Sequence, residues 1–324
     1  MSLPSPANRK VLVTGASGFI GSRLCVRLRD DGAEVHAVAR TRRRTDPDGL
    51  HWWYGDLAEE ETFPAVLKAV RPDTVFHLAS HVEGGRDVEL VMPTFRSNLL
   101  ATIHLLTAAV ETPCRRVILC GSLEEPAAGE PYAVPSSPYA AAKWASTAYA
   151  RMFHALYGLP VVIMRVFMVY GPGQWNLRKL VPYVTLSLLR GEAPKLTGGE
   201  RQVDWIYVDD VVDAFIAAAA AAEGIEGATV DVGSGKLETV RNVAGRIADL
   251  IDPGLQPSYG ALPDRPFEQV RRANPRLSGS VIDWTPKVSL EDGLRETVNW
   301  YREHRVALVE ETEDKSGKPA GRWS

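Results

Sequence analysis

Short apolar runs alternate with amphipathic segments along the first half of the chain. The runs rich in β-branched residues, which predict buried strands, lie at residues 11–13, 35–39, 74–78, 117–120 and 161–164. Helical periodicity at residues 19–28 and 98–110 separates some of these runs. Strands that are apolar throughout are typical of a parallel sheet buried on both faces, and right-handed crossovers then give a doubly wound α/β fold.

The pattern changes at Gly171, where glycines and prolines begin to interrupt the apolar runs. A strand-like run at 204–208 leads into an alanine-rich helix at 211–222, and further helices are predicted at 240–250 and 290–301. We therefore expect two domains. The doubly wound domain comprises residues 1–170 and about 204–233, a smaller mixed α/β domain comprises residues 171–203 and 234–308, and residues 309–324 form a disordered tail.

The composition narrows the class of protein without identifying a function. The chain has 324 residues, of which 45% are hydrophobic and 24% charged, and a formal net charge of −3, which is ordinary for a globular protein and unlike a nucleic-acid-binding one. No apolar run reaches the roughly 18 residues of a membrane span, and residues 1–10 lack the apolar core of a secretion signal. The three cysteines form no C-x-x-C pair, and His77 and His81 lack a third ligand, so we expect no metal site. We expect a cytoplasmic protein that binds neither membranes nor nucleic acid.

A glycine-rich sequence follows the first predicted strand and opens the first predicted helix. Gly15 suits a tight turn, Gly18 lets the backbone approach a pyrophosphate, and Gly21 lets the helix pack closely on the sheet. The free N–H groups and the positive end of the helix dipole favour phosphate binding. The sequence therefore predicts a dinucleotide site. Its residues are Gly15, Ser17, Gly18, Phe19, Ile20 and Gly21.

The end of the second predicted strand carries arginines where NAD-binding proteins usually carry a carboxylate for the ribose 2′-hydroxyl. Arg40 and Arg43 offer guanidinium groups that suit a 2′-phosphate. We therefore predict NADP as the cofactor, with NAD as the second choice. One alternative is a solvated basic loop, which Asp46 and Asp48 partly neutralise, and another is a nucleic-acid patch, which nothing else in the chain supports.

Tyr139 and Lys143 are four residues apart, and therefore lie on one face of a predicted helix. An ammonium near the phenol favours the phenolate, so Tyr139 could exchange a proton with a substrate hydroxyl while a hydride moves to or from a nicotinamide. Lys143 could also hold the nicotinamide ribose. Ser122 follows a predicted strand at the carboxyl end of the sheet, where it could hydrogen-bond the same substrate oxygen. Taken alone, a tyrosine and a lysine at this spacing are more often surface residues.

Together these motifs resemble those of the extended short-chain dehydrogenase/reductases, and specifically the nucleotide-sugar epimerase/dehydratase family. The resemblance covers about residues 10–303. It implies a Rossmann-type domain that binds NAD(P), and a carboxyl-terminal part that grips a nucleoside diphosphate sugar. The matching positions are residues 14–21, 55–57, 77–80, 138–143, 170–173, 208–211, 283–286 and 290–301, together with Asn98, Ser122 and Arg165.

The resemblance implies roles for further residues around the cofactor. Asp56 and Leu57 would flank the adenine. Leu78, Ala79 and Ser80 would border the cofactor, and Ser80 would also face the sugar.

The resemblance likewise implies a set of substrate-binding residues. These are Ser80, Ser122, Asn176, Lys179, Arg201 and Arg265. The chain departs from the family pattern in two places: Met168 stands where many members have Asn, and Val203 stands where many have Arg. Arg201 could reach the diphosphate from a shifted position.

The residues after Ser122 bear on the reaction. Glu124 lies where the family's 4,6-dehydratases have a catalytic glutamate, but Leu123 replaces the aspartate of many members. An exposed acidic loop is the other interpretation of Glu124 and Glu125. We favour a C4 ketoreductase of a nucleoside diphosphate 4-keto-deoxyhexose, because Arg40 indicates NADP, the usual cofactor of a net reductant. A 4-epimerase and a dehydratase that uses Glu124 are the alternatives; a non-catalytic NADP-binding regulator is disfavoured because the Ser, Tyr and Lys are all present.

Relatives commonly dimerise through the two helices predicted at residues 98–110 and 139–153. Ala141, Ala145 and Ala148 give the second helix an alanine-rich face. We therefore predict a homodimer with a four-helix interface.

Overall fold

The structure, a computed structural model, describes residues 9–42, 48–126, 133–263 and 269–316. The chain forms two compact units. The first unit comprises residues 1–169, 204–236 and 265–287, and the second comprises residues 170–203, 237–264 and 288–324. We expected residues 234–308 to belong to the smaller domain, whereas residues 265–287 group with the first unit.

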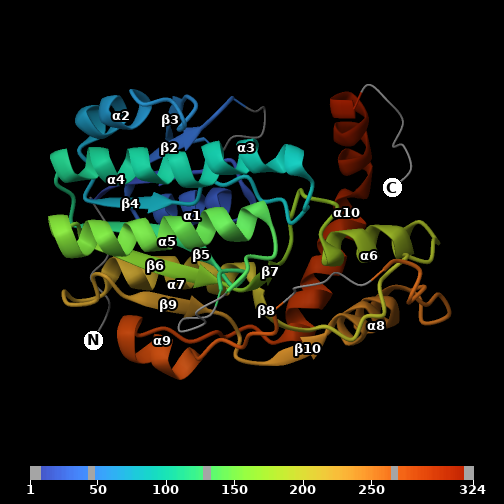
Figure 1. The fold of residues 1–324 in the computed structure, drawn as a ribbon. Helices are drawn as coiled ribbons and strands as arrows, with labels where there is room; N and C mark the ends of the chain where they lie inside the picture. The colour runs from blue at the N-terminus through green and yellow to red at the C-terminus, as the bar shows by residue number, and fades with distance from the viewer. Residues whose placement is uncertain (1–8, 43–47, 127–132, 264–268, 317–324) are drawn as a thin grey trace. The chain divides into compact units, whose positions relative to one another are not determined.

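A seven-stranded parallel sheet forms the centre of the first unit (Figure 1). Its strands are β1 Lys10–Thr14, β2 Glu34–Ala39, β3 His51–Tyr54, β4 Thr74–His77, β5 Arg116–Ser122, β6 Val161–Val166 and β9 Thr229–Val232. Their order across the sheet is β3-β2-β1-β4-β5-β6-β9, and every neighbouring pair is parallel. This arrangement confirms the predicted doubly wound α/β fold.

Helices cover both faces of this sheet. They are α1 Phe19–Asp30, α2 Thr62–Val70, η1 Val88–Leu90, α3 Val91–Thr94, η2 Phe95–Leu100, α4 Ala101–Glu111, α5 Pro138–Tyr157, α7 Val208–Ala220 and α9 Pro275–Ile282. Val11 and Val13 of β1 pack in one core with α1, α7 and α9, whereas Leu12 packs in the other with α2, α4 and α5. Because both faces are covered, successive residues along the middle of a strand such as β1 are apolar, which is the pattern seen in the sequence.

The second unit contains α6 Leu180–Leu189, α8 Val240–Ile251, α10 Leu290–Ser316 and the short strand β10 Leu237–Thr239. A three-stranded sheet has the order β10-β8-β7, where β7 is Met168–Tyr170 and β8 is Gln202–Tyr207. Tyr301 of α10 is fully buried, and its hydroxyl donates to the Gln174 carbonyl at 2.7 Å. Helix α10 continues to Ser316, beyond residue 309, where we expected a disordered tail to begin.

One buried carboxylate joins distant segments of the first unit. Asp204 accepts hydrogen bonds from the backbone N–H groups of Ser234, Gly235 and Ala273 at 2.7–2.9 Å, and from the Ser234 hydroxyl at 2.7 Å. Burial raises the Asp204 pKa, and these donors oppose that rise by stabilising the charged form.

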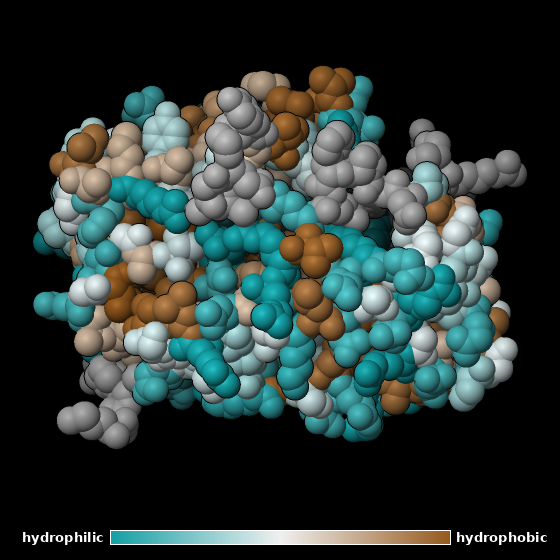
Figure 2. Space-filling view, turned by 60° about the horizontal axis from the view of Figure 1, so that its bottom comes forward, coloured by the Kyte–Doolittle hydropathy of each residue, from teal (hydrophilic) through white to brown (hydrophobic). Residues whose placement is uncertain are grey.

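Hydrophilic residues cover most of the face shown in Figure 2, with smaller groups of hydrophobic residues among them. Among the described residues, no helix has the length and apolar character needed to cross a bilayer.

Candidate active site

In the glycine loop between β1 and α1, a side chain at Gly15 or Gly21 would collide with nearby backbone atoms. Gly15 has φ +67°, and a Cβ there would lie 2.7 Å from the Ala79 backbone nitrogen. A Cβ on Gly21 would collide with the Gly15 carbonyl oxygen. Gly18 is the extended N-cap of α1 and provides no side-chain cap, so the first N–H groups of the helix face outward for an anion. The loop therefore fits the pyrophosphate of a dinucleotide. The other predicted residues of this loop are Ser17, in the turn, and Phe19 and Ile20, in the first turn of α1.

Two neighbouring strand ends form the edge where an adenosine would lie. The Gly55 N–H donates to the Ala39 carbonyl at 3.1 Å, which joins the end of β3 to the end of β2. Arg40 follows Ala39 directly and is exposed, and Arg43 lies outside the described residues. Asp56 is exposed, and its carboxylate accepts from the Ala58 N–H at 2.9 Å. Leu57, by contrast, is buried in the core that contains α2.

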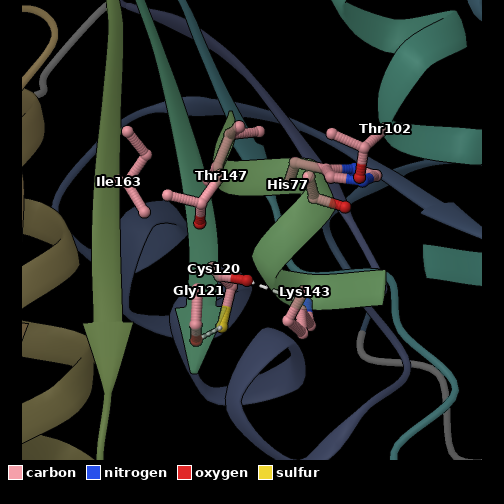
Figure 3. A pocket seen from close by; sticks show the side chains of 9 residues that line it. His77, Thr102, Cys120, Gly121, Lys143, Thr147 and Ile163 are labelled. Carbon is pink, nitrogen blue, oxygen red and sulfur yellow. Dashed lines mark hydrogen bonds between the residues drawn. The ribbon is translucent and has the colours of Figure 1, made fainter. Parts of the chain in front are cut away.

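Helix α5 brings Tyr139 and Lys143 to the end of β5. The helix begins where the Ser137 hydroxyl caps the Ala140 N–H at 3.1 Å, with Pro138 at its first position. Lys143 is buried, its Nζ donates to the Cys120 carbonyl at 2.8 Å, and it lies 5.9 Å from the centre of the Tyr139 ring. Figure 3 shows Lys143 pointing from its helix toward β5.

Ser122, the last residue of β5, completes this constellation. It is buried, and it forms a side-chain hydrogen bond with Tyr139. Burial raises the pKa of Tyr139 above that of an ordinary phenol, the nearby Cys120 and Glu124 add to the rise, and the bond with Ser122 opposes it. We expected Lys143 and the positive nicotinamide of a cofactor together to favour the phenolate; among the protein's own groups, burial has the largest effect and raises the Tyr139 pKa.

A chain of hydrogen bonds lies behind Lys143. Thr102 Oγ1 donates to the Asn98 carbonyl at 2.6 Å and lies 3.2 Å from His77 Nε2, so that nitrogen must carry a proton and donate to Thr102. His77 Nδ1, 2.8 Å from Thr14 Oγ1, is then the acceptor. Burial, together with the Lys143 charge, lowers the pKa of His77 from 6.5 to about 3. His77 is thus a neutral, packed histidine, and it lines a small cavity with Thr102, Cys120 and Lys143 (Figure 3).

Asn98 fixes the segment that follows β4. It lies in a π-helical turn, η2, and its Oδ1 accepts from the His81 N–H at 2.6 Å and from the Ser80 hydroxyl at 3.2 Å. The Ala79 N–H donates to Thr14 Oγ1 at 3.2 Å. The predicted cofactor-bordering residues Leu78, Ala79 and Ser80 are therefore held next to the glycine loop. The sequence pattern predicted an ordinary helix from residue 98 and did not predict the π-helical turn.

The turn after Ser122 contains a buried glutamate that we had not assigned to the site. Glu125 is 1% exposed and accepts from the Ser122 N–H at 2.7 Å, whereas Glu124 is only half-buried. The sequence does carry a signal for this bond, because a Ser followed three residues later by Glu is a capping-box pattern.

The structure describes three of the residues predicted to bind the nucleotide, and the fourth, Arg265, lies outside the described residues. Asn176, Lys179 and Arg201 belong to the second unit. The Asn176 carbonyl accepts from the Lys179 N–H at 3.0 Å, just before α6 begins. Arg201 is half-buried. Within the part of the chain that the structure describes, no three His, Cys, Asp or Glu side chains are grouped to hold a metal ion.

Comparisons with known proteins place this geometry in context. The model of the NAD-dependent epimerase/dehydratase family matches residues 11–233. A UDP-glucose 4-epimerase of Mycolicibacterium smegmatis is 30% identical over 314 residues, which cover 90% of this chain and 98% of that protein. A dTDP-glucose 4,6-dehydratase of Escherichia coli is 27% identical and covers 90% of this chain and 92% of its own length. The structure of the Thermus thermophilus UDP-glucose 4-epimerase in complex with NAD has a TM-score of 0.78 and 29% identity, with 90% of this chain and 99% of that chain covered.

Proposed function

Because this chain belongs to the NAD-dependent epimerase/dehydratase family, it is an enzyme, and we propose that it transfers a hydride at carbon 4 of the sugar in a nucleoside diphosphate sugar. The observation that carries this proposal is the convergence of Ser122, Tyr139 and Lys143 at the carboxyl end of β5. The glycine loop supports it, because the close backbone packing at Gly15 and Gly21 fits the pyrophosphate of a nicotinamide dinucleotide.

The three side chains divide the proton chemistry between them. When bound, the nicotinamide supplies or accepts the hydride at the sugar carbon. Tyr139 gives its phenolic proton to the C4 oxygen during reduction and takes it back during oxidation. Ser122 donates a hydrogen bond to the same oxygen, and the Lys143 ammonium stabilises the phenolate that proton transfer leaves behind.

We favour net reduction of a 4-keto-deoxyhexose by NADPH as the specific reaction. Arg40 and Arg42 are exposed beyond β2, where a carboxylate would be needed for the ribose hydroxyl of NAD. The raised pKa of Tyr139 keeps the phenol protonated at the start of a reduction, when the C4 oxygen needs a proton. Leu123 is buried and apolar, so it offers no carboxylate to a dehydratase mechanism.

A 4-epimerase is the second candidate. Its support is the 30% identical relative that is named UDP-glucose 4-epimerase, and the NAD bound to the Thermus epimerase. Such an enzyme recycles its cofactor, and therefore consumes none.

One assay separates these reactions. The purified protein is mixed with NADPH or NADH and a 4-keto-6-deoxy sugar in its TDP, UDP and GDP forms, and cofactor absorbance and product mass are followed together. A ketoreductase consumes one NADPH for each sugar that gains two hydrogens. With unmodified hexose nucleotides and no net cofactor change, an isomer of equal mass identifies the epimerase, and loss of water identifies the dehydratase.

The Tyr139→Phe variant tests whether the site is catalytic. We expect a fall in turnover of about 10²–10⁴-fold with unchanged NADPH affinity, because only the transferable proton is lost. Turnover equal to that of the wild type would contradict the role of Tyr139. Absence of any reaction in the wild type, with NADPH still bound, would favour the non-catalytic regulator.

We also propose that the enzyme is a homodimer built on α4 and α5. The outer face of α5 exposes Ala141, Trp144, Ala148 and Tyr149, a stripe of apolar side chains at helical spacing. An aromatic side chain such as Trp144, 42% exposed, suits the centre of an interface.

A further inference from the structure

Two hydrogen bonds tie Ser122 to the two glutamates of the turn that follows it. The Ser122 Oγ accepts from the Glu124 N–H at 3.2 Å, and the Glu125 Oε1 accepts from the Ser122 N–H at 2.7 Å. The second bond is the one that the glutamate of a capping box makes, whereas the Ser122 hydroxyl bonds the N–H two residues on and not three, as it would in that motif. The described residues that follow, 123–126, form no helix: the Glu125 N–H closes a single turn on the Ser122 carbonyl at 3.2 Å.

The surroundings of Glu125 show that its carboxylate is built into the site. The side chain is 1% exposed, although an unpaired buried carboxylate is costly. A Cβ on Gly121 would lie 2.8 Å from Glu125 Oε1, so the glycine before Ser122 makes room for this oxygen. Arg271 donates to the Glu125 carbonyl at 2.6 Å and clamps the turn from a segment 146 residues away.

The two bonds determine how the Ser122 hydroxyl can be used. Its oxygen already accepts the Glu124 N–H, and a hydroxyl has one proton to donate. The backbone of Ser122 is fixed on the other side by Glu125, and the next residue is tied to β6 because the Leu123 N–H donates to the Val166 carbonyl at 3.0 Å. The proton of Ser122 is therefore left to point toward Tyr139 and the substrate oxygen.

We propose that Glu125 is a positioning residue, which accepts the Ser122 N–H and thereby presets the Ser122 hydroxyl as a hydrogen-bond donor to the reacting oxygen. This proposal rests on the proposed function for its effect on turnover. The Glu125 carboxylate itself touches neither substrate nor cofactor in this assignment. Its length matters more than its charge, because the Ser122 N–H needs an acceptor at the end of this side chain.

Two conservative variants separate the length of the side chain from its charge. Glu125→Gln keeps an acceptor oxygen at the same reach and removes the charge; Glu125→Asp keeps the charge and withdraws it by one methylene. We expect kcat to fall about 10–100-fold in Glu125→Asp, because small misplacements of reacting groups cost about that much. We expect kcat within about threefold of wild type in Glu125→Gln, and KM and NADPH affinity within about twofold in both. Melting temperatures and circular dichroism show that both variants are folded.

A second measurement does not depend on turnover. Amide hydrogen exchange of Ser122 should accelerate in Glu125→Asp by about tenfold or more and stay near the wild-type rate in Glu125→Gln. The Leu123 amide, bonded to β6, is the internal control and should keep its rate in both variants.

These outcomes separate failure of the positioning role from failure of the proposed function. An equal loss of kcat in both variants, or loss in Glu125→Gln alone, would overturn the positioning role, because charge would then be the property required. Unchanged Ser122 exchange in Glu125→Asp would also overturn it. If the wild type turns over no sugar nucleotide while Ser122 exchange responds as expected, the hydrogen bond is supported and the proposed function is rejected.

Discussion

The buried histidine of the first unit makes the stability of the protein depend on pH. His77 has a pKa of about 3 in the folded protein and 6.5 as its ordinary value, a difference that corresponds to about 5 kcal/mol. Between these values the unfolded chain binds a proton here that the folded chain cannot bind. Stability from this group is therefore complete above the unfolded pKa and declines as the pH falls. Between pH 7 and pH 5 the expected loss in the free energy of unfolding is about 2 kcal/mol.

The His77→Gln variant isolates this contribution. Gln keeps a donor toward Thr102 but leaves the Thr14 hydroxyl without its acceptor, so we expect a loss of about 1–3 kcal/mol at pH 7. Urea denaturation at pH 7 and pH 5 should then show the variant losing about 2 kcal/mol less than the wild type over that interval. His304→Gln, which changes an exposed histidine in α10, should keep the wild-type dependence on pH. Equal losses in wild type and His77→Gln would show that folded His77 does take up a proton, and the neutral network would be wrong.

Two further substitutions test the cofactor and the assembly. Arg40→Ala should weaken NADPH binding by about 10–100-fold and leave NADH binding unchanged, as measured by calorimetry. The control is Arg276→Ala, which changes another exposed arginine of the first unit. Equal effects on both cofactors, or an effect from the control, would contradict the role given to Arg40. Trp144→Asp should convert a dimer into a monomer in light scattering, whereas Trp175→Asp, 43% exposed in the second unit, should leave the dimer intact. A wild-type protein that is monomeric at working concentration would refute the interface.

The sequence predicted the doubly wound sheet because its strands are buried on both faces and are therefore apolar along their central positions. It also predicted that Ser122, Tyr139 and Lys143 would meet, since helical spacing and strand ends determine their places. The sequence pattern did not predict the edge strand β3. Its side chains, His51 to Tyr54, are aromatic and partly exposed, and apolar and polar positions do not alternate clearly along it.

Other features depend on tertiary surroundings that no local pattern records. The two adjacent glutamates favoured an exposed acidic loop as one interpretation, yet in the fold Glu125 is buried and accepts a hydrogen bond from the Ser122 N–H. The raised pKa of Tyr139 follows chiefly from burial, which the nearby Cys120 and Glu124 reinforce, and burial cannot be read from a four-residue spacing. Membership of residues 265–287 in the first unit likewise rests partly on the bond from Ala273 to Asp204.

The hydrogen bonds of Asp204 bear on how such enzymes can be recombined. The chain passes between the two units at five points, so no contiguous stretch of sequence contains the whole of either unit. Asp204 lies immediately after one of these junctions, Gly235 lies just before another, and Ala273 lies in a third segment. A chimaera that takes its second unit from a relative must therefore splice several separate stretches of sequence. Because Asp204 and its donors all belong to the first unit, the splice points must leave residue 204 and the segments around Gly235 and Ala273 in place, or a buried charge would lose its partners.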